Sequence, residues 1–258
     1  MLPLPDKIAG LQTASHYTEP VQMLIDQYHS ETAGQIIFSR QQASDFAKDI
    51  ADDFNPLHDV DAKKFCVPGD LLFSLVLSRY GINQHMAFSF SGMVTDSTAL
   101  NFPAASPSIN IADNSDKLYM TIERSGDNTV NPSLIDSLTK SYVSFSGKTF
   151  PHILIPLLEQ QQVMINPDRP MVIYQSMLIA LDSLDVDNVE LALDQERTSL
   201  ETNGKRGKVC LAFNLLSAGK VIGRGEKHMV LSGLKPLDKP AADALIADYN
   251  QRKIAYKG

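Results

Sequence analysis

The pattern of apolar and polar positions first predicts a short strand followed by an amphipathic helix. Gln35 to Ser39 is an apolar strand candidate. Ser39, with Gln42 three positions later, forms a capping box for a helix with apolar residues at helical spacing. Those residues are Ala43, Phe46, Ala47, Ile50, Ala51 and Phe54. Because Pro56 disfavours helical geometry in the residue before it, we expect the helix to end in a polar turn at Asn55.

Two short apolar segments that open with proline predict central helices. Asp70 to Leu77, after Pro68-Gly69, is apolar on nearly every side, which indicates a helix buried all round. Phe150 to Leu158 repeats the pattern, with Pro151 near its start. Strand-like segments follow both helices, at 86–94, 108–111, 117–124, 171–181, 189–200, 208–216 and 220–231. The order of elements therefore predicts two structural repeats in one chain.

The repeat suggests a division of the chain into units. We expect an N-terminal arm and helix over residues 1–32, with the helix at Pro20 to Gln27, and two repeat units over 33–130 and 131–235. A C-terminal amphipathic helix follows in 236–258, at Pro240 to Tyr256. One helix wrapped by an antiparallel sheet in each unit is the simplest packing, which gives an α+β fold.

Composition excludes several functional classes. The 258 residues suffice for one large or two small domains, at roughly 150 residues per domain. Thirty acidic against 23 basic residues give a net charge of −7, which disfavours nucleic acid as a partner. The most apolar run, Leu71 to Leu77, is far shorter than the about 20 residues of a membrane span. The sequence leaves a homodimer open.

Cysteine usage and the start of the chain bear on cofactors and location. Cys66 and Cys210 lack the paired Cys or Cys/His spacing of common zinc and redox sites, so no metal or other cofactor is expected. Met1 to Ala14 lacks the apolar core of a signal peptide. We therefore expect reduced thiols and a cytoplasmic location.

The stretch Asp53-Phe54-Asn55-Pro56-Leu57-His58 carries the most specific chemistry. A carboxylate at a helix end and a histidine five residues later, across a proline turn, can converge on one water. Such a pair is a general acid/base device. A structural interpretation also fits, in which Asn55 caps the helix, Pro56 ends it and His58 lies on the surface.

These six residues, with Phe46-Ala47 before them and Ala62, Phe65 and a glycine-led apolar helix after them, resemble the hydratase-2 signature. That signature is typical of the (R)-specific enoyl-CoA hydratases and MaoC-like dehydratases of the hotdog superfamily. The resemblance covers residues 40 to 80, and beyond them only the element order is similar. It implies a hotdog fold, a central helix wrapped by an antiparallel sheet. Together with the predicted repeat, this indicates a double hotdog in a single chain, with two central helices wrapped by one continuous antiparallel sheet. The chain is also similar to an uncharacterised family of proteobacterial proteins, which implies no substrate.

The resemblance also implies a role for each residue of the signature. Asp53 and His58 would activate water, Asn55 would support the turn, and Gly69 would donate a backbone N–H that polarises a thioester carbonyl. The implied reaction is hydration of a trans-2-enoyl thioester or its reverse, with acyl-CoA or an acyl carrier protein thioester as partner. The chain departs from the family at Pro68, where histidine is usual, and in a shorter interval between His58 and Gly69.

Two other functions fit the same residues: a non-catalytic acyl-thioester or lipid-binding protein, and a hotdog thioesterase in which Asp53 directs water at the carbonyl. Calcium is excluded, because His58 and Lys64 occupy positions where an EF-hand loop needs glycine and glutamate. His152 is a candidate for a second site or for a structural role at a helix start.

The second unit also contains one basic segment and one glycine-rich segment. Lys205 to Lys208 is interpreted as a solvated hairpin turn or a contact to an anionic carrier. Gly223-Arg224-Gly225 is interpreted as a bulge or a close contact between strands.

Overall fold

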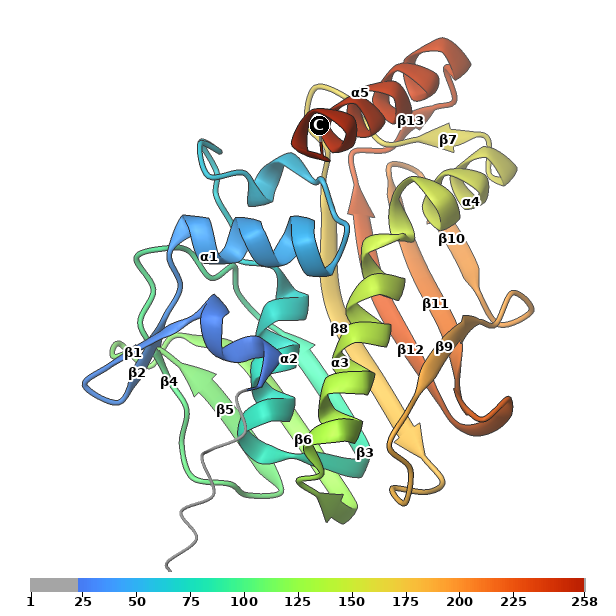
Figure 1. The fold of residues 1–258 in the computed structure, drawn as a ribbon. Coiled ribbons are helices and arrows are strands. Elements are labelled where there is room, and N and C mark those ends of the chain that lie inside the picture. Colours follow the sequence, from blue (N-terminus) through green and yellow to red (C-terminus); the bar gives the residue numbers. More distant parts are fainter. Residues whose placement is uncertain (1–22, 258) are drawn as a thin grey trace, which may run out of the picture.

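Two central helices lie side by side in the hollow of one large sheet (Figure 1). In the computed structural model, which describes residues 23–257, these helices are α2 (Gly69–Tyr80) and α3 (Pro132–Gly147). Nine of the 12 residues of α2 are buried, as expected for a helix enclosed on all sides. The apolar residues of α3 follow a helical period and are buried, among them Leu134, Leu138 and Tyr142.

The sheet has eleven strands, and all of its pairings are antiparallel. Its order is β1-β2-β4-β5-β6-β3-β8-β12-β11-β10, with β9 also paired to β11. The strands are β1 (Ser30–Thr32), β2 (Gln35–Ile37), β3 (Ile82–Phe90), β4 (Leu100–Asn101), β5 (Ser108–Ala112), β6 (Leu118–Thr129), β8 (Val172–Leu181), β9 (Glu190–Leu193), β10 (Ser199–Asn203), β11 (Arg206–Ser217) and β12 (Lys220–Ser232). A separate pair joins β7 (Val163–Met164) to β13 (Lys235–Pro236).

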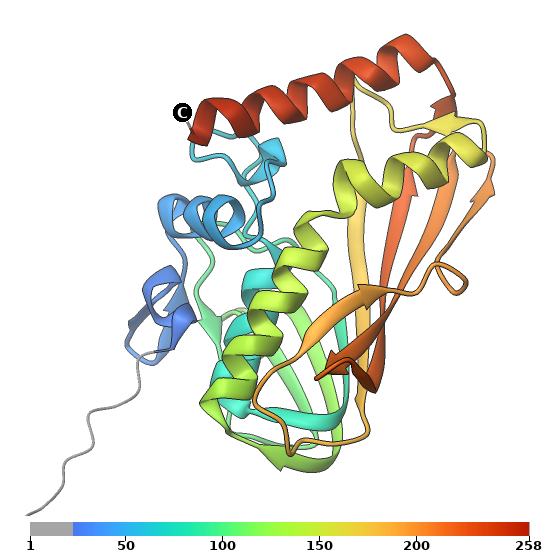
Figure 2. The same ribbon diagram turned by 45° about the vertical axis from the view of Figure 1, so that its right-hand side comes forward.

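The remaining helices surround this core, and α5 crosses one end of the molecule (Figure 2). They are η1 (Leu24–Tyr28), α1 (Arg40–Asp45), η2 (Phe46–Ile50), η3 (Pro56–His58), η4 (Thr149–Ile153), α4 (Leu154–Gln160) and α5 (Lys239–Lys257). None of the described helices is both long and apolar enough to span a bilayer.

The two halves of the chain share one sheet and one core. Strand β3 of the first half pairs with β8 of the second, with Phe88 opposite Met177. One hydrophobic cluster includes side chains from both halves, such as Phe73 of α2 and Phe213 of β11. The predicted α+β class is confirmed, and so is the double hotdog with two helices wrapped by a continuous antiparallel sheet.

The position predicted for the second central helix is wrong. The helix that lies beside α2 begins at Pro132, whereas the segment at Pro151 is an irregular connection into the short helix α4. Asn131 caps α3 by accepting a hydrogen bond from Ser133 N–H, and Pro132 occupies its first turn. Proline favours that position, so Pro132 starts this helix.

Smaller differences concern element ends. The segment 189–200 forms two strands, β9 and β10, with a turn between them. The capping box at Ser39 is present, but α1 continues as the π-helix η2 and the regular winding ends before Phe54. The helix expected at Pro20 to Gln27 lies partly outside the described residues, and the described part holds only the 3-10 helix η1. The C-terminal helix is as expected, and the strands predicted at 208–216 and 220–231 pair as a hairpin.

Candidate functional site

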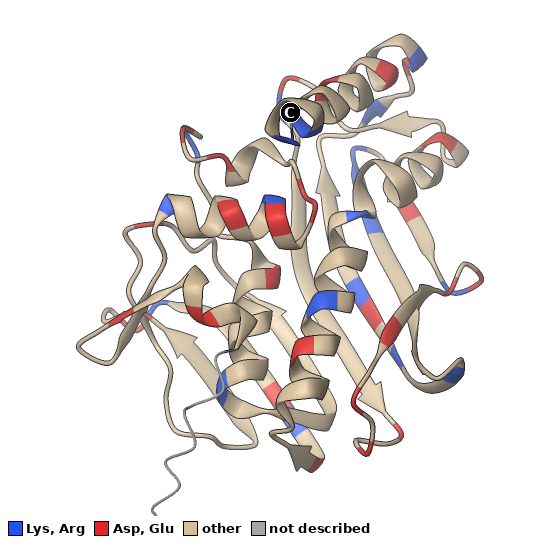
Figure 3. Cartoon of the chain, viewed as in Figure 1, with Lys and Arg blue, Asp and Glu red and all other residues tan. Residues whose placement is uncertain are grey.

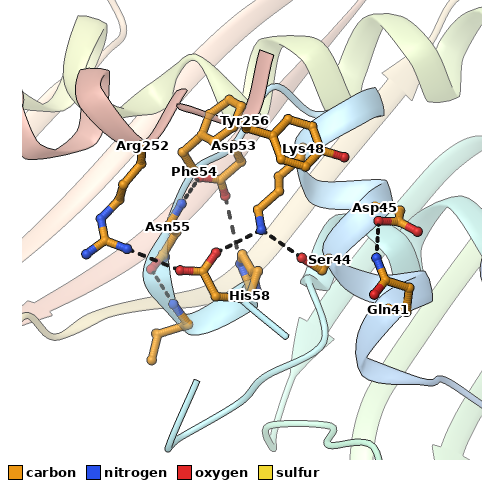
Figure 4. Close-up of polar contacts among 12 residues, drawn as sticks. Gln41, Ser44, Asp45, Lys48, Asp53, Phe54, Asn55, His58, Arg252 and Tyr256 are labelled. Atoms are coloured by element: carbon orange, nitrogen blue, oxygen red, sulfur yellow. Dashed lines mark hydrogen bonds and ion pairs between the residues drawn. The ribbon is translucent and has the colours of Figure 1, made fainter. Parts of the chain in front are cut away.

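The structure places the side chains of Asp53 and His58 close together at the turn after η2 (Figure 4). Asp53 Oδ2 lies 3.8 Å from His58 Nε2, and the two side chains are 26% and 12% exposed, respectively. This separation is longer than a direct hydrogen bond, and one water can bind both atoms. The pair is therefore arranged to share a solvent molecule at a partly open surface.

The tautomer of His58 follows from its second contact. His58 Nδ1 lies 2.7 Å from the carbonyl oxygen of Cys66. Because a carbonyl oxygen only accepts, Nδ1 carries the proton and Nε2 of the neutral ring keeps its lone pair. Nε2, which faces Asp53, is thus free to accept a proton.

Asn55 holds the turn between the two groups. Its backbone N–H donates to Asp53 Oδ1 at 3.0 Å, and its side-chain oxygen accepts from Leu57 N–H at 3.1 Å. Pro56 opens the 3-10 turn η3, which carries His58. These contacts orient the carboxylate and start the turn.

The Asp53 carboxyl has an unusual electrostatic setting. Burial raises its pKa above the ordinary value and is the largest cause, and the nearby Asp70 charge raises it further. His58, the Asn55 N–H and Lys227 act in the opposite direction. A carboxyl with a raised pKa can hold a proton more readily than an exposed one, which suits a group that both gives and takes protons.

Gly69 starts α2 and lies between two aromatic rings. A Cβ at this position would lie 2.9 Å from Tyr174 Cδ1 and 3.3 Å from Phe90 Cε1, so a larger residue would displace the rings. Within residues 23–257, the Gly69 N–H donates to no protein acceptor. It therefore remains available at the positive end of the helix dipole.

A buried polar cluster, which the sequence did not predict, joins the two halves next to Gly69. Its members are Asp70 of α2, Ser146 of α3 and Lys227 of β12. Ser146 Oγ donates to Asp70 Oδ2 and accepts from Lys227 Nζ. The Lys227 ammonium also lies 3.8 Å from Asp70 Oδ1 and 4.2 Å from the centre of the Tyr174 ring.

Two tyrosines border this cluster. The hydroxyls of Tyr142 and Tyr174 are hydrogen-bonded to each other. Burial, together with the neighbouring tyrosine and Asp70, raises the pKa of Tyr142 well above its ordinary range, and burial and Asp70 do the same for Tyr174. Both hydroxyls therefore stay protonated and act as neutral hydrogen-bonding groups beside Asp70 and Lys227.

The C-terminal helix α5 contacts the turn through hydrogen bonds and ion pairs. Tyr249 of α5 accepts from Phe54 N–H and donates to the Asp52 carbonyl oxygen, both at 3.2 Å. Lys253 and Lys257 pair with the Asp52 carboxylate, and Arg252 pairs with Asp59 at 3.2 Å. Acidic and basic residues are interspersed on α1 and α5, which is consistent with these ion pairs (Figure 3). Residues far apart in the sequence thus fix the backbone on both sides of Asp53.

The close approach of α3 to the turn depends on Gly147. A Cβ at Gly147 would lie 1.7 Å from the carbonyl oxygen of Ala51, a distance that no real side chain can adopt. Gly147 therefore lets the end of α3 pack directly against the backbone that precedes Asp53, which brings Ser146 within reach of Asp70.

The sequence contains two signals for this buried cluster, the positions of Asp70 and Lys227. Asp70 is the one charged residue between Gly69 and Leu77 in a helix otherwise apolar or small. In β12, Lys227 lies two residues from Gly225 and two from Met229, and both of those residues are buried. Residues two apart in a strand point to the same face, so the Lys227 side chain also points inward. Their convergence with Ser146 depends on the packing of α2, α3 and the sheet.

The other sequence candidates lie elsewhere. His152 is exposed in the irregular segment η4. Gly223 and Gly225 lie at close contacts within the sheet. A Cβ at Gly223 would lie 2.4 Å from the Ala180 carbonyl oxygen, and a Cβ at Gly225 would lie 2.2 Å from the Phe213 ring. Lys205 lies in the turn between β10 and β11, as expected for a hairpin.

Two shallow grooves of about 530 Å³ each lie on the described surface, and neither is lined by Asp53, His58 or Gly69. One crosses the outer face of the sheet and includes Leu178 and Glu226. The other is lined by residues of 93–119. The side chains of Asp53 and His58 are themselves partly exposed at the turn.

Residues 23–240 match the family described as "Protein of unknown function (DUF3581)". No curated protein matches the chain. Among solved structures, a MaoC-like dehydratase is 9% identical, with coverage of 80% of this chain and 98% of that one and a TM-score of 0.40. An N-terminal dehydratase from the difficidin assembly line is 9% identical, with 72% and 91% coverage and a TM-score of 0.35.

An acyl-ACP thioesterase from Bacteroides thetaiotaomicron is also 9% identical, with 64% and 90% coverage and a TM-score of 0.32. At such identities and scores, the description of the fold rests on the sheet and helices of the chain itself.

Proposed function

Since the chain belongs to the DUF3581 family, whose description names no activity, we propose a function from the geometry of its site: hydration of a trans-2-enoyl thioester to the 3-hydroxyacyl thioester, or the reverse dehydration. The observation that carries the proposal is the arrangement of Asp53 Oδ2 and His58 Nε2, 3.8 Å apart on a partly open turn. The segment from Asp53 to His58 resembles the hydratase-2 signature, and this resemblance supports the same chemistry.

In the proposed reaction, a water bound between the two groups attacks C3 of the enoyl thioester. His58 Nε2 takes one proton from that water as the new C–O bond forms. The electron pair of the C2–C3 double bond moves towards the thioester carbonyl, and C2 then takes a proton from the Asp53 carboxyl. Proton transfer from His58 to Asp53 restores the pair. The raised pKa of Asp53 supports this role, because the group must carry a proton when C2 accepts one.

Negative charge develops on the thioester oxygen during the addition. The Gly69 N–H, unpaired among the described residues and located at the start of α2, is the group that we propose to stabilise it. Such a fixed donor in a water-poor site contributes about 10²- to 10³-fold to rates in other enzymes. Tyr174 and Phe90, the rings beside Gly69, would border the thioester.

A panel of enoyl thioesters from crotonyl to dodecenoyl, on CoA and on acyl carrier protein, tests the proposal. The expected result is loss of the enoyl absorbance without release of free thiol. Release of free thiol would contradict the proposal and identify a thioesterase instead, in which Asp53 directs water at the carbonyl. Tight binding with neither change would favour a non-catalytic acyl-thioester binding protein. Asp61→Asn, which alters an exposed acid on the same turn, is the matched control variant.

A further inference from the structure

Cys210, Glu226 and His228 come together on the face of the sheet opposite the central helices. In β11 and β12, Cys210 lies directly opposite His228. Glu226 is two residues before His228, and residues two apart in a strand point to the same face. Lys227, which lies between them, points inward to Asp70 and Ser146. The three side chains therefore share the outer face.

Their ligand atoms form a compact set. One atom of each residue, the Cys210 sulfur, a Glu226 oxygen and a His228 ring nitrogen, lies within 4.8 Å of the other two. His228 Nε2 is 3.2 Å from Glu226 Oε2. All three residues are partly buried, and the His228 side chain is 33% exposed. Small side-chain rotations would bring the three atoms onto one ion at the roughly 2.0–2.3 Å typical of zinc.

Arg197 orients the carboxylate of this set. Its guanidinium pairs with Glu226 Oε1, which leaves Oε2 directed at His228. Metal-binding carboxylates are commonly held by such an outer hydrogen bond. The positive charge of Arg197 also offsets part of the negative charge that a thiolate and a carboxylate would bring together. The set thus has the outer support that a metal site requires.

A shallow groove reaches one of the three ligands, Glu226. The groove on the outer face of the sheet, of about 530 Å³, includes Glu226 and Arg197 among its lining residues. Three protein ligands beside an open groove leave a fourth position for water, as in an open zinc site. We infer that Cys210, Glu226 and His228 bind a divalent transition-metal ion of the zinc class, with water as the fourth ligand.

The donor set determines which metals are expected. Thiolate and imidazole favour zinc and its chemical neighbours over magnesium or calcium, which prefer oxygen ligands. The metal binds the thiolate form of cysteine, so binding displaces the thiol proton of Cys210. The affinity should therefore rise with pH. The ion would join β11 to β12 on the face opposite Lys227.

The test uses untagged full-length protein, freed of metal with a chelator and titrated with Co²⁺ as the spectroscopic probe. We expect one equivalent to bind with a thiolate-to-cobalt absorption band, and Zn²⁺ to displace it. Cys210→Ser and His228→Ala should each weaken binding by more than about 100-fold. Arg197→Ala, which removes an outer-shell partner, should weaken it by about 10- to 100-fold.

Cys66→Ser and His152→Ala are the matched controls, because each removes the same residue type away from the site, and both should bind Co²⁺ as the wild type does. Absence of the absorption band in the wild type would overturn the inference. Equal binding by the ligand variants, or equal loss in the controls, would also overturn it. Circular dichroism of the metal-free variants verifies folding, and if Cys210→Ser fails to fold, His228→Ala decides alone. These outcomes do not depend on enoyl-thioester turnover.

Discussion

The turn at Asp53 and the cluster around Lys227 are neighbouring polar regions with opposite character. At the turn, Asp53 and His58 are partly exposed, and their facing atoms are too far apart for a direct hydrogen bond. In the cluster, Asp70, Ser146 and Lys227 are buried as whole residues, and Ser146 is bonded to both charged partners. The first arrangement leaves Asp53 Oδ2 and His58 Nε2 free for a solvent molecule, whereas the second directs most of its polar atoms at one another.

This difference suggests a division of roles between the halves of the chain. The first half supplies the turn and the start of α2. The second half supplies Ser146, Lys227 and Tyr174, whose ring lies beside Gly69. Mutations in the two regions should therefore separate activity from stability.

The largest effect is expected from Lys227→Met. Without the ammonium, Asp70 is left as a buried charge without compensation, which costs about 3–5 kcal/mol of unfolding free energy. Denaturant unfolding measures the loss. Lys208→Met, at an exposed position of β11, is the matched control and should change stability by less than about 0.5 kcal/mol. Adding Asp70→Asn to Lys227→Met should recover part of the loss, and a single variant as stable as the wild type would contradict the ion-pair account.

The second effect concerns catalysis. Asp53→Asn and His58→Ala should each lower enoyl-thioester turnover by at least about 10²-fold, because each removes one member of an acid/base pair. The free energy of unfolding should change by only about 1 kcal/mol, since neither side chain fills the core. The double variant should be scarcely slower than either single one, because the two groups act on one water. Lowered melting temperatures with unchanged rates would assign the turn a structural role.

Gly147→Ala should have an intermediate effect on both regions. The new Cβ cannot fit against the Ala51 carbonyl, so the end of α3 must move away from the turn. Overpacking of this kind costs about 1–3 kcal/mol. We expect lower stability together with lower turnover, measured by thermal unfolding and enoyl hydration. Gly219→Ala, in the β11–β12 hairpin, meets no atom within 4 Å but has a φ of +74°, so it adds backbone strain without overpacking; as a control for lost stability alone, it should leave turnover unchanged.

The smallest effect is in the pH dependence of stability. Burial raises the pKa of Asp53, so its contribution to stability is present at low pH and is lost as pH rises through its folded pKa. For Asp52, burial alone would raise the pKa, but Lys253 and Lys257 hold it below the ordinary 3.8. Its contribution is therefore present at neutral pH and is lost as pH falls through the lowered value.

Unfolding measured from pH 3 to pH 7 should separate these adjacent carboxylates. Asp52→Asn should lower stability at pH 7 and have little effect at acid pH, whereas Asp53→Asn should not lower it at pH 7 by this mechanism. The effects will be modest, because both side chains are partly exposed and screened. Parallel curves for the two variants would contradict the opposite pKa shifts.

Local sequence was sufficient for the first half of the fold. The capping box at Ser39, the turn at Pro56 and the apolar helix after Gly69 each depend on contacts within a few residues. The prediction placed the second central helix at Pro151, because the nearly all-apolar segment there is typical of a buried helix, whereas the helix begins at Pro132.

The sequence by itself determined the six-residue turn that carries Asp53, Asn55 and His58, since proline geometry and the Asn55 cap act locally. Only the tertiary structure decided that Lys227 meets Asp70, that α5 covers the turn, and that Cys210 lies opposite His228. These contacts join residues far apart in the chain, and their register is set by sheet pairing and helix packing, which no short segment encodes alone.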